Sequence, residues 1–529
     1  MSNINHQKYT NLSLFFAVTV RIVTALYWIV RYGQHWLEDD TARITAGILA
    51  VFQSGQLAPE SGRIYANGFL YPVYGTFLAH LADITIIDLQ IWGFIPLTVA
   101  LTVVIFVFYK RILNNPVAAA AATVMINLQA DFIFTSSRGT HEKIVYMLVC
   151  VSLIAITFST MKARAVSQRI AFATVYYLSA FALSTTNVFF ASTFTVMMIA
   201  VFLTWYVLAT YTNKNKRLAI QLAYIASVSF IFVYLITFII YPPAINVALV
   251  GVDLVGRVGK FLLSYQPQET VYQAADQAWI FPRAWLFLRL FDLSLMALAA
   301  FGWLDLARKV IKQRDGKGDL PTKYFWLLSL FPAFAIQNFL ALLSDLTGSA
   351  SDISNLQIRL APLTAFVAAP LAIHTLQQLW ARRPRQQNQR RLATSSMALV
   401  MVVFLSMVLI KSTSEPMLSN TWLFYTPAEA TGVSWLDEHI VLPFSEEVGS
   451  TSHVWAGSNF RVGRLWLNNY WNKTKGQIPV TSSSTEPYQF IFLSSTIRQL
   501  AARQHKPLPN ILPALRVYDN GDTRIYLEP

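Results

Sequence analysis

Long apolar segments recur along the chain from near its N-terminus to about residue 412. Each is close to the ~20 residues that an α-helix needs to cross the ~30 Å hydrocarbon core of a bilayer. The segments are continuous and do not alternate with a period of two, which favours helices over the strands of a membrane barrel. They predict a polytopic α-helical membrane protein with about eleven transmembrane helices. The segments lie at residues 12–30, 86–109, 117–134, 142–160, 170–187, 188–211, 218–240, 284–307, 323–345, 359–380 and 393–412.

Two shorter apolar stripes fall in the first predicted outer loop, residues 31–85. Residues 70–82 are too few to span a bilayer, but their apolar positions recur at intervals of three and four. This spacing is typical of a helix that lies flat at the membrane surface. The stripe consists of Leu70, Val73, Tyr74, Phe77, Leu78 and Leu81. A second stripe of the same kind consists of Ile44, Ile48, Val51 and Phe52.

Hydropathy falls after residue 412, and the pattern changes to that of a small α/β domain. An Asn520-Gly521 pair between two apolar runs is typical of a hairpin with a type I′ turn. We therefore expect a transmembrane module over residues 1–412, with a long outer loop at 241–282, and a separate domain over 413–529. Within that domain we expect a helix and three strands, at residues 429–439, 488–493, 516–518 and 523–527.

The composition agrees with a membrane protein and excludes other classes. Hydrophobic residues make up 55% of the chain and charged residues only 13%, whereas soluble domains carry about 25% charged residues. An ordinary soluble enzyme and a disordered protein are therefore excluded. The one cysteine, Cys150, lies in an apolar run. It allows neither a disulfide within the chain nor a cysteine metal cluster.

The net charge of +14 would suggest nucleic acid in a soluble protein. Here the lysines and arginines gather in alternate loops, and acidic residues predominate in the others before the tail. The positive-inside rule then predicts a cytoplasmic N-terminus and an extracytoplasmic C-terminal domain in the plasma membrane. Residues 12–30 read as a retained first span, because no small-residue cleavage site follows them. The basic excess is explained by topology, so nucleic acid is not expected as a partner.

Acidic residues mark two of the predicted outer loops. Asp39 and Asp40 follow the first span, with Arg43 close by. Either aspartate could instead be the N-cap of the helix that follows, which is a common structural role. His141 and Glu142 stand at the start of a predicted span, where a charge is costly unless it is paired or functional. The structural alternative there is a cap by Thr140, with Glu142 paired to Lys143 or Arg138.

Basic side chains on the predicted outer side could hold a phosphate at the membrane surface. The alternative is that they snorkel to the interface. Arg21 differs from them because it stands mid-span, where a charge costs ~2.5–3.5 kcal/mol on insertion scales, so we expect it to pair with an inward-facing acid. The candidates for phosphate binding are Arg257, Lys260, Arg283, Arg289 and Arg359.

The order of these features resembles the GT-C superfamily of integral-membrane glycosyltransferases, including enzymes similar to protein O-mannosyltransferases and aminoarabinose transferases. The features are Arg21 within the first span, Asp39-Asp40-Thr41-Ala42-Arg43, Gly68-Phe69-Leu70-Tyr71-Pro72-Val73-Tyr74, and Ser137-Arg138 followed by Glu142. The tail segments Gly432-Val433-Ser434-Trp435-Leu436 and Val517-Tyr518-Asp519-Asn520-Gly521 are similar to outer domains of such enzymes. The chain departs from the oligosaccharyltransferase pattern because its tail has no Trp-Trp-Asp-Tyr-Gly motif. A second departure is that Glu142, beside a histidine, stands where many relatives have aspartate.

The resemblance implies a GT-C-like fold and an inverting hexosyl- or pentosyltransferase that takes its sugar from a polyprenyl-phosphate carrier. Asp39 or Asp40 would be the general base, and Glu142 would join it at the site. The other candidates for substrate binding are Arg43, Tyr71, Arg138, His141 and the five phosphate-binding cations named above. The expected partners are the lipid-linked donor, membrane lipids and an acceptor that is a protein, a lipid or a glycan. No cofactor is certain, although the acidic residues could hold a divalent metal.

Two other classes of function compete with an enzyme. A transporter or flippase for a lipid-linked sugar would tend to carry charges near mid-membrane and broken helices in paired halves. A scaffold that binds a partner through its tail would not need acids in both the first and the second outer loops. The observed charges favour the glycosyltransferase.

Overall fold

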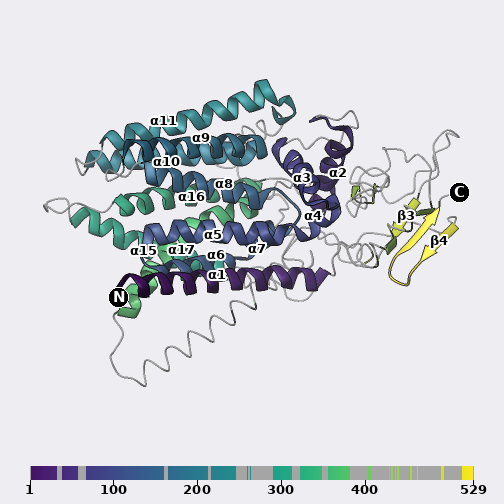
Figure 1. Ribbon diagram of the computed structural model, residues 1–529, viewed down its shortest axis with the longest axis horizontal. Helices are drawn as coiled ribbons and strands as arrows, with labels where there is room; N and C mark the ends of the chain where they lie inside the picture. The colour runs from purple at the N-terminus through teal and green to yellow at the C-terminus, as the bar shows by residue number, and fades with distance from the viewer. Residues whose placement is uncertain are drawn as a thin grey trace, which may run out of the picture.

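The computed structural model is mostly helical, with a small sheet near the C-terminus (Figure 1). The predicted fold class, a polytopic helical protein with a small C-terminal sheet, is confirmed. The structure describes residues 2–32, 39–57, 67–159, 165–211, 216–245, 290–312, 322–347, 356–381, 490–493 and 515–527. It also describes isolated positions between residues 256 and 498.

Long helices form a bundle whose core is apolar. The large indoles of Trp28, Trp205 and Trp326 are fully or almost fully buried in it. Proline stands at the first position of α6, after an Asn115 side chain that accepts hydrogen bonds from two backbone amides of the first turn. The helices are α1 (Ser2–Tyr32), α5 (Phe94–Leu113), α6 (Pro116–Asn127), α7 (Ala130–Ser137), α8 (Glu142–Ser159), α9 (Val166–Thr186), α10 (Val188–Tyr211), α11 (Lys216–Leu235), α15 (Leu290–Lys312), α16 (Thr322–Thr347) and α17 (Leu356–Ala381).

Eight of the described helices are long and apolar enough to cross a membrane, or nine if the bent pair α6–α7 counts as one span. The eight helices and the bent pair together match nine of the eleven predicted segments. The predicted segment at 170–187 is the helix α9, which is not among these eight. The segment at 393–412 lies almost entirely outside the described residues. The total of eleven therefore stays a prediction.

The third predicted span is not one straight helix. It divides into α6 and α7, which meet at an angle of 72°. The break has a local cause, because the Gln129 side chain accepts a hydrogen bond from the Phe132 backbone amide and so caps a new helix. The segment predicted as a span at 117–134 is therefore present as a bent pair of helices and not as one continuous helix.

Three short helices gather at the end of the bundle where α1 finishes (Figure 1). They are α2 (Asp39–Ser54), α3 (Leu70–Ala82) and α4 (Ile86–Trp92). The structure confirms the helix predicted at 70–82, and α2 carries the second predicted stripe. Ile44 and Ile48 of that stripe are buried against Tyr71 and Ala79 of α3. The two stripes thus pack partly on one another, and their place at the membrane surface stays a prediction.

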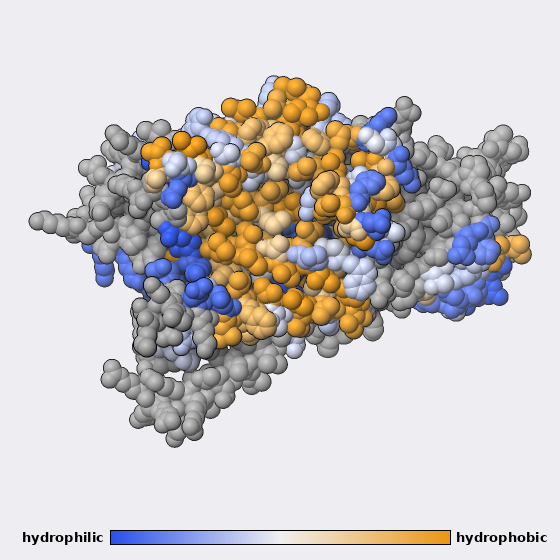
Figure 2. Space-filling view, viewed as in Figure 1, coloured by the Kyte–Doolittle hydropathy of each residue, from blue (hydrophilic) through white to orange (hydrophobic). Residues whose placement is uncertain are grey.

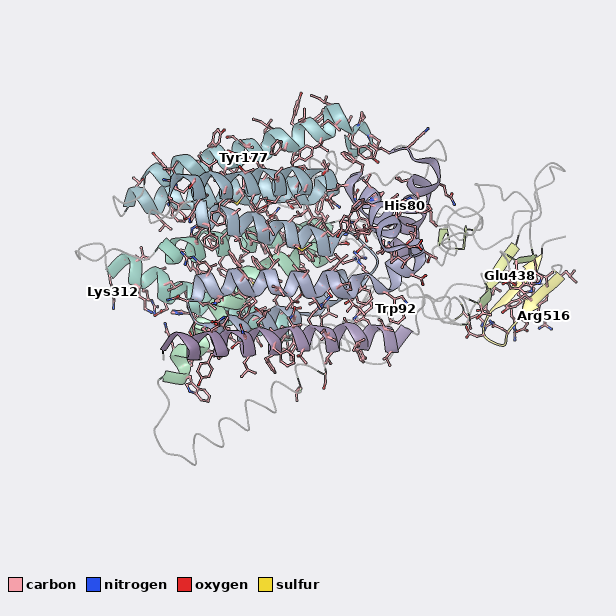
Figure 3. All side chains as sticks on the ribbon, viewed as in Figure 1. His80, Trp92, Tyr177, Lys312, Glu438 and Arg516 are labelled. Carbon is pink, nitrogen blue, oxygen red and sulfur yellow. The ribbon has the colours of Figure 1, made fainter. Side chains whose placement is uncertain are left out.

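The outside of the bundle is apolar. A broad hydrophobic belt covers the visible face, with hydrophilic residues toward both ends (Figure 2). Large side chains such as Phe15, Phe301 and Ile336 point outward, as expected for lipid-facing positions. Lys312 lies at the end opposite to His80 and Trp92 (Figure 3). The described part of the chain therefore has the band expected of a membrane protein.

The C-terminal sheet has the strand order β3-β5-β4 and is antiparallel. Its strands are β3 (Phe490–Leu493), β4 (Leu515–Asp519) and β5 (Arg524–Leu527), and a two-stranded ladder is formed by β1 (His453–Val454) and β2 (Arg461–Val462). The hairpin is confirmed, but its turn is not type I′. That turn needs positive φ at two central residues, and Gly521 alone has it here, with φ 88°. The turn is centred on Gly521 and Asp522, because the Asn520 amide donates to the Thr523 carbonyl.

Candidate functional site

The loop between α7 and α8 carries a group of ionisable side chains that are buried. Arg138, His141, Glu142 and Lys143 are each at most 2% exposed. Two hydrogen bonds within the turn stabilise it. The Lys143 ammonium donates to the backbone carbonyls of Arg138 at 2.8 Å and Thr140 at 2.6 Å. A cation that satisfies two carbonyl groups makes a tight turn of this kind tolerable inside the protein. We call residues 138–143 the acidic turn.

Glu142 is paired within the acidic turn. Its Oε1 lies 2.5 Å from Nη2 of Arg138, one helical turn away, and the Arg138 guanidinium also lies 4.8 Å from the centroid of the Phe134 ring. The structural alternative drawn from the sequence, an Arg138–Glu142 pair, is therefore present. The second carboxylate oxygen, Oε2, is buried and accepts no hydrogen bond from the described residues. Oε2 lies 3.9 Å from Nδ1 of His141.

The short helices are tied to the acidic turn through Gly139. Its backbone amide donates to Thr41 Oγ1 at 3.1 Å, and its carbonyl accepts from Gln90 Nε2 at 2.7 Å. Gln90 also donates to Thr45 Oγ1 at 3.2 Å and accepts from the Tyr71 hydroxyl at 3.0 Å. One glutamine therefore links α2, α3, α4 and the acidic turn.

This network brings the two predicted acidic segments together. Asp39 and Asp40 occupy the first turn of α2, immediately before Thr41, where the helix dipole stabilises negative charge. Thr41 bonds to Gly139, only three residues before Glu142. The side chains of Asp39, Asp40 and Arg43 are outside the described part of the structure. The contact between the start of α2 and the acidic turn is made by the Thr41 hydroxyl and the Gly139 backbone amide.

We predict that Gly139→Ala disrupts this contact. The added Cβ would lie 2.6 Å from Thr41 Cγ2 and 3.3 Å from Gln90 Nε2, so the Thr41 side chain that makes the contact has to shift. Overpacking of this kind costs about 1–3 kcal/mol of folding free energy, and a displaced catalytic group can cost about 10²-fold in rate. Thermal unfolding and substrate turnover of the purified variant measure the two effects.

Gly302→Ala is the matched control, because its Cβ would meet the Leu371 carbonyl oxygen at 2.4 Å between α15 and α17. It should lose stability but keep its turnover per folded molecule. Equal turnover losses in both variants would mean that the Gly139 contact has no special part in the site.

His141 is held between the acidic turn and the break between α9 and α10. Its Nε2 lies 2.6 Å from Asn187 Nδ2, and its ring packs edge-on against Tyr71 and Phe190. Burial lowers the pKa of His141 to about 4, and the positive charges of Arg359, Arg138 and Lys143 oppose protonation further, although Glu142 favours it. The imidazole is therefore neutral at pH 7.

This lowered pKa predicts an acid-dependent loss of stability. The unfolded chain binds a proton at His141 below its ordinary pKa of about 6.5, whereas the folded chain binds it only near pH 4. Stability should be full above pH 6.5 and should fall as the pH drops from about 6.5 to 4, by roughly 3 kcal/mol from this group. Unfolding of wild type and His141→Gln across that range measures it. Identical pH slopes in the two proteins would contradict the assignment.

Arg359 also lies near this group of buried ionisable side chains. The Tyr146 hydroxyl donates to the Arg359 carbonyl at 3.1 Å, and the Arg359 charge acts on both His141 and Glu142.

Arg21 was expected to pair with an acid. Instead its Nη2 donates to the hydroxyl of Ser136 at 2.6 Å, and no carboxylate accepts from it among the described residues.

Five of the predicted site residues thus meet in one place, namely Tyr71, Arg138, His141, Glu142 and Arg359. Four others lie outside the described residues, namely Arg257, Lys260, Arg283 and Arg289. Within the described residues, no group of three or more histidine, cysteine, aspartate or glutamate side chains could hold a metal ion.

The sequence analysis did not identify Gln90 and Asn187 as residues of the site. The available signal was a lone amide within the apolar run 86–109 (Gln90) and another at the end of the run 170–187 (Asn187).

Comparison with known proteins finds similarity in structure and not in sequence. No family model matches the chain, and no curated protein matches its sequence. The apo oligosaccharyltransferase of Archaeoglobus fulgidus matches 95% of this chain and 64% of its own with a TM-score of 0.54 at 14% identity. The same organism's AglB with an inhibitory peptide and a dolichol-phosphate matches 81% and 58%, with a TM-score of 0.53 at 12% identity.

A second kind of solved structure is similar over its whole length. ArnT from Cupriavidus metallidurans, bound to undecaprenyl phosphate, matches 96% of this chain and 97% of its own, with a TM-score of 0.50 at 11% identity. The chain spans less than two thirds of the archaeal protein but almost all of ArnT. At these identities the likeness concerns the fold. The chain therefore has the fold that the archaeal oligosaccharyltransferase and ArnT share.

Proposed function

We propose that the protein is a glycosyltransferase that moves a sugar from a polyprenyl-phosphate carrier to an acceptor at the outer face of the membrane. The observation that carries the proposal is the contact between the first turn of α2 and the acidic turn, made by Thr41 and Gly139. It brings the Asp39-Asp40 segment next to a buried Glu142 and its cations. The shared fold supports the same conclusion, because AglB was solved with a dolichol-phosphate and ArnT with undecaprenyl phosphate.

The first step proposed is activation of the acceptor. Asp39 or Asp40 removes the proton from an acceptor hydroxyl or amine, and a base in this position contributes about 10²–10⁴-fold. The activated oxygen or nitrogen forms a bond to the anomeric carbon of the sugar. Glu142 and His141 bind and orient the group that reacts.

The second step proposed is departure of the lipid phosphate. The bond between the anomeric carbon and the phosphate oxygen breaks as the new bond forms on the opposite face, so the configuration inverts. The phosphate leaves as an anion and needs positive charge rather than a proton. Arg359, whose positive charge acts on both His141 and Glu142, is a described candidate for this role. The remaining candidates are Arg43, Arg257, Lys260, Arg283 and Arg289.

The orientation of the protein follows the same proposal. The short helices, the acidic turn and the C-terminal domain lie on the extracytoplasmic side, and the N-terminus is cytoplasmic. The positive-inside distribution of lysine and arginine supports this assignment. The bundle over 1–412 carries the chemistry, and β1, within the domain proposed over 413–529, contacts α2.

The proposal is tested with the purified protein in lipid nanodiscs and a panel of radiolabelled polyprenyl-phosphate sugars. We expect label to pass from the lipid phase to an added acceptor fraction, with release of one polyprenyl phosphate for each sugar transferred. The anomeric configuration of the product should be opposite to that of the donor. In sealed vesicles, movement of intact labelled donor between the leaflets without any transfer would identify a flippase and overturn the proposal.

A further inference from the structure

Three prolines inside α16 and α17 leave backbone carbonyls that need another hydrogen-bond donor. They are Pro332 in α16 and Pro362 and Pro370 in α17. Proline has no amide hydrogen, so the carbonyl four residues before it loses its usual partner in the helix. In the hydrocarbon core no water replaces that partner. A donor from another helix is therefore expected at each of these positions.

Two of these carbonyls are taken by aromatic side chains of neighbouring helices. The carbonyl four residues before Pro332 accepts from the indole nitrogen of Trp303, in α15, at 3.0 Å. The carbonyl four residues before Pro370, that of Phe366, accepts from the hydroxyl of Tyr109, in α5, at 2.6 Å. The bundle thus compensates for a missing backbone donor with a side chain from an adjacent helix.

At Pro362 the donor from another helix is Tyr146, in α8. Its hydroxyl donates to the Arg359 carbonyl at 3.1 Å, which directly follows the carbonyl that Pro362 leaves without a partner. Both carbonyls belong to the first turn of α17, which the proline ties less firmly to the rest of the helix. The position of this first turn therefore depends on Tyr146.

The Tyr146 ring is buried and packed on two sides. It lies against Phe132 with the ring centroids 5.9 Å apart and the planes at 26°, and it meets the Phe190 ring edge-on at 6.1 Å. Its hydroxyl also lies 3.2 Å from Thr135 Oγ1 of α7, three residues before Arg138. One hydroxyl group therefore stands where α7, α8 and α17 meet.

These contacts relate Arg359 to the acidic turn. Tyr146 lies one helical turn after Glu142 in α8, and the charge of Arg359 acts on both His141 and Glu142. In the proposed reaction the phosphate gains negative charge as it leaves, and a cation stabilises that charge only when it is correctly placed. A shift of the first turn of α17 would move Arg359 without changing its charge.

We propose that Tyr146 is a positioning residue whose hydroxyl holds the first turn of α17, and so places the Arg359 guanidinium to receive the lipid phosphate. Tyr146 acts through Arg359 and does not itself bind the substrate. This inference rests on the proposed glycosyl transfer for the role of Arg359, whereas the hold on α17 can be measured without any turnover.

The hold on α17 is tested by amide hydrogen exchange of the full-length protein in lipid nanodiscs, measured by mass spectrometry. Tyr146→Phe keeps the ring and removes the hydroxyl. We expect the amides of residues 360–364 to exchange about 5–10-fold faster than in wild type, as for the loss of one hydrogen bond. Unchanged exchange in this segment would overturn the inference, even if transfer is observed.

The effect on the reaction is tested with Tyr146→Phe and Arg359→Gln, alone and together. Tyr146→Phe should lower kcat for sugar transfer by about 10–100-fold, as for the displacement of a catalytic group. Arg359→Gln removes the charge but keeps the carbonyl to which Tyr146 donates. Because Tyr146 acts through Arg359, adding Tyr146→Phe to Arg359→Gln should lower kcat little further. Losses that multiply in the double variant would contradict the proposed role.

Tyr109→Phe is the matched control. Tyr109 is also buried and also donates to a carbonyl of α17, but at Phe366, two turns beyond Arg359. This variant should lose thermal stability to a similar extent and keep the wild-type kcat. A fall in kcat equal to that of Tyr146→Phe would show that any weakening of α17 slows transfer, and the inference would be wrong. If the wild type transfers no sugar at all, the proposed function fails, and the exchange experiment still decides whether Tyr146 holds α17.

Discussion

Replacing the proposed catalytic base with its neutral amide is expected to lower the rate of sugar transfer by about 10²–10⁴-fold. Asp39→Asn and Asp40→Asn are compared because both residues lie in the first turn of α2, beside the Thr41 contact with Gly139. Asparagine has the size of aspartate but cannot take a proton from an acceptor. The residue that acts as the base should show the full loss in kcat, and the other should show a smaller one.

The measurement is the initial rate of label transfer from a polyprenyl-phosphate sugar at saturating acceptor. Asp83→Asn is the matched control, since Asp83 ends α3 with φ 52° and asparagine tolerates this left-handed backbone well. It should retain the wild-type rate. Wild-type rates for Asp39→Asn and Asp40→Asn as well would remove the base from the mechanism.

Glu142→Gln is expected to lower the free energy of unfolding by about 3–5 kcal/mol, because it removes a carboxylate that pairs with the buried Arg138 guanidinium at 2.5 Å. Arg138 is 0% exposed and Glu142 is 1% exposed, so water cannot replace the missing charge. Lys143 and Arg359 add further positive charge nearby. Chemical unfolding in detergent, followed by tryptophan fluorescence, measures the loss.

The double variant Arg138→Met with Glu142→Gln separates stability from chemistry. Replacing both partners of a buried ion pair with neutral groups is often close to neutral for stability, so the double variant should recover most of the lost stability. It should still transfer sugar far more slowly than wild type, since the carboxylate is absent. Full recovery of transfer would mean that the pair is only structural.

Several elements could be predicted because the responsible pattern is local. The stripe beginning at Leu70 repeats every three to four residues, and the helix α3 has the bounds predicted from it. The Asn520-Gly521 pair between two apolar runs predicted a hairpin, and β4 and β5 form it. The predicted turn type was wrong, because the hydrogen bond between Asn520 and Thr523 places Gly521 and Asp522 at the centre of the turn instead of Asn520 and Gly521. The residue types alone do not reveal this shift by one residue.

The site depended on contacts between residues far apart in sequence. Glu142 and Arg138 could be paired from their spacing of four, whereas the bond between Thr41 and Gly139 joins positions 98 residues apart. Gln90 and Asn187 act through single side-chain amides, which resemble ordinary polar positions in a sequence. The expectation that Arg21 needs an acid was wrong because it considered only opposite charge, and a serine hydroxyl and the Phe132 ring face Arg21 instead.

The most direct measurement is a cryo-electron microscopy structure of the full chain with a non-transferable phosphonate analogue of a polyprenyl-phosphate sugar. We predict that the sugar lies between the first turn of α2 and the acidic turn, with its anomeric carbon facing an Asp39 or Asp40 carboxylate and its phosphonate near Arg359. An analogue bound elsewhere in the bundle, or Asp39 and Asp40 directed into lipid with Glu142 sealed away from the sugar, would contradict the account.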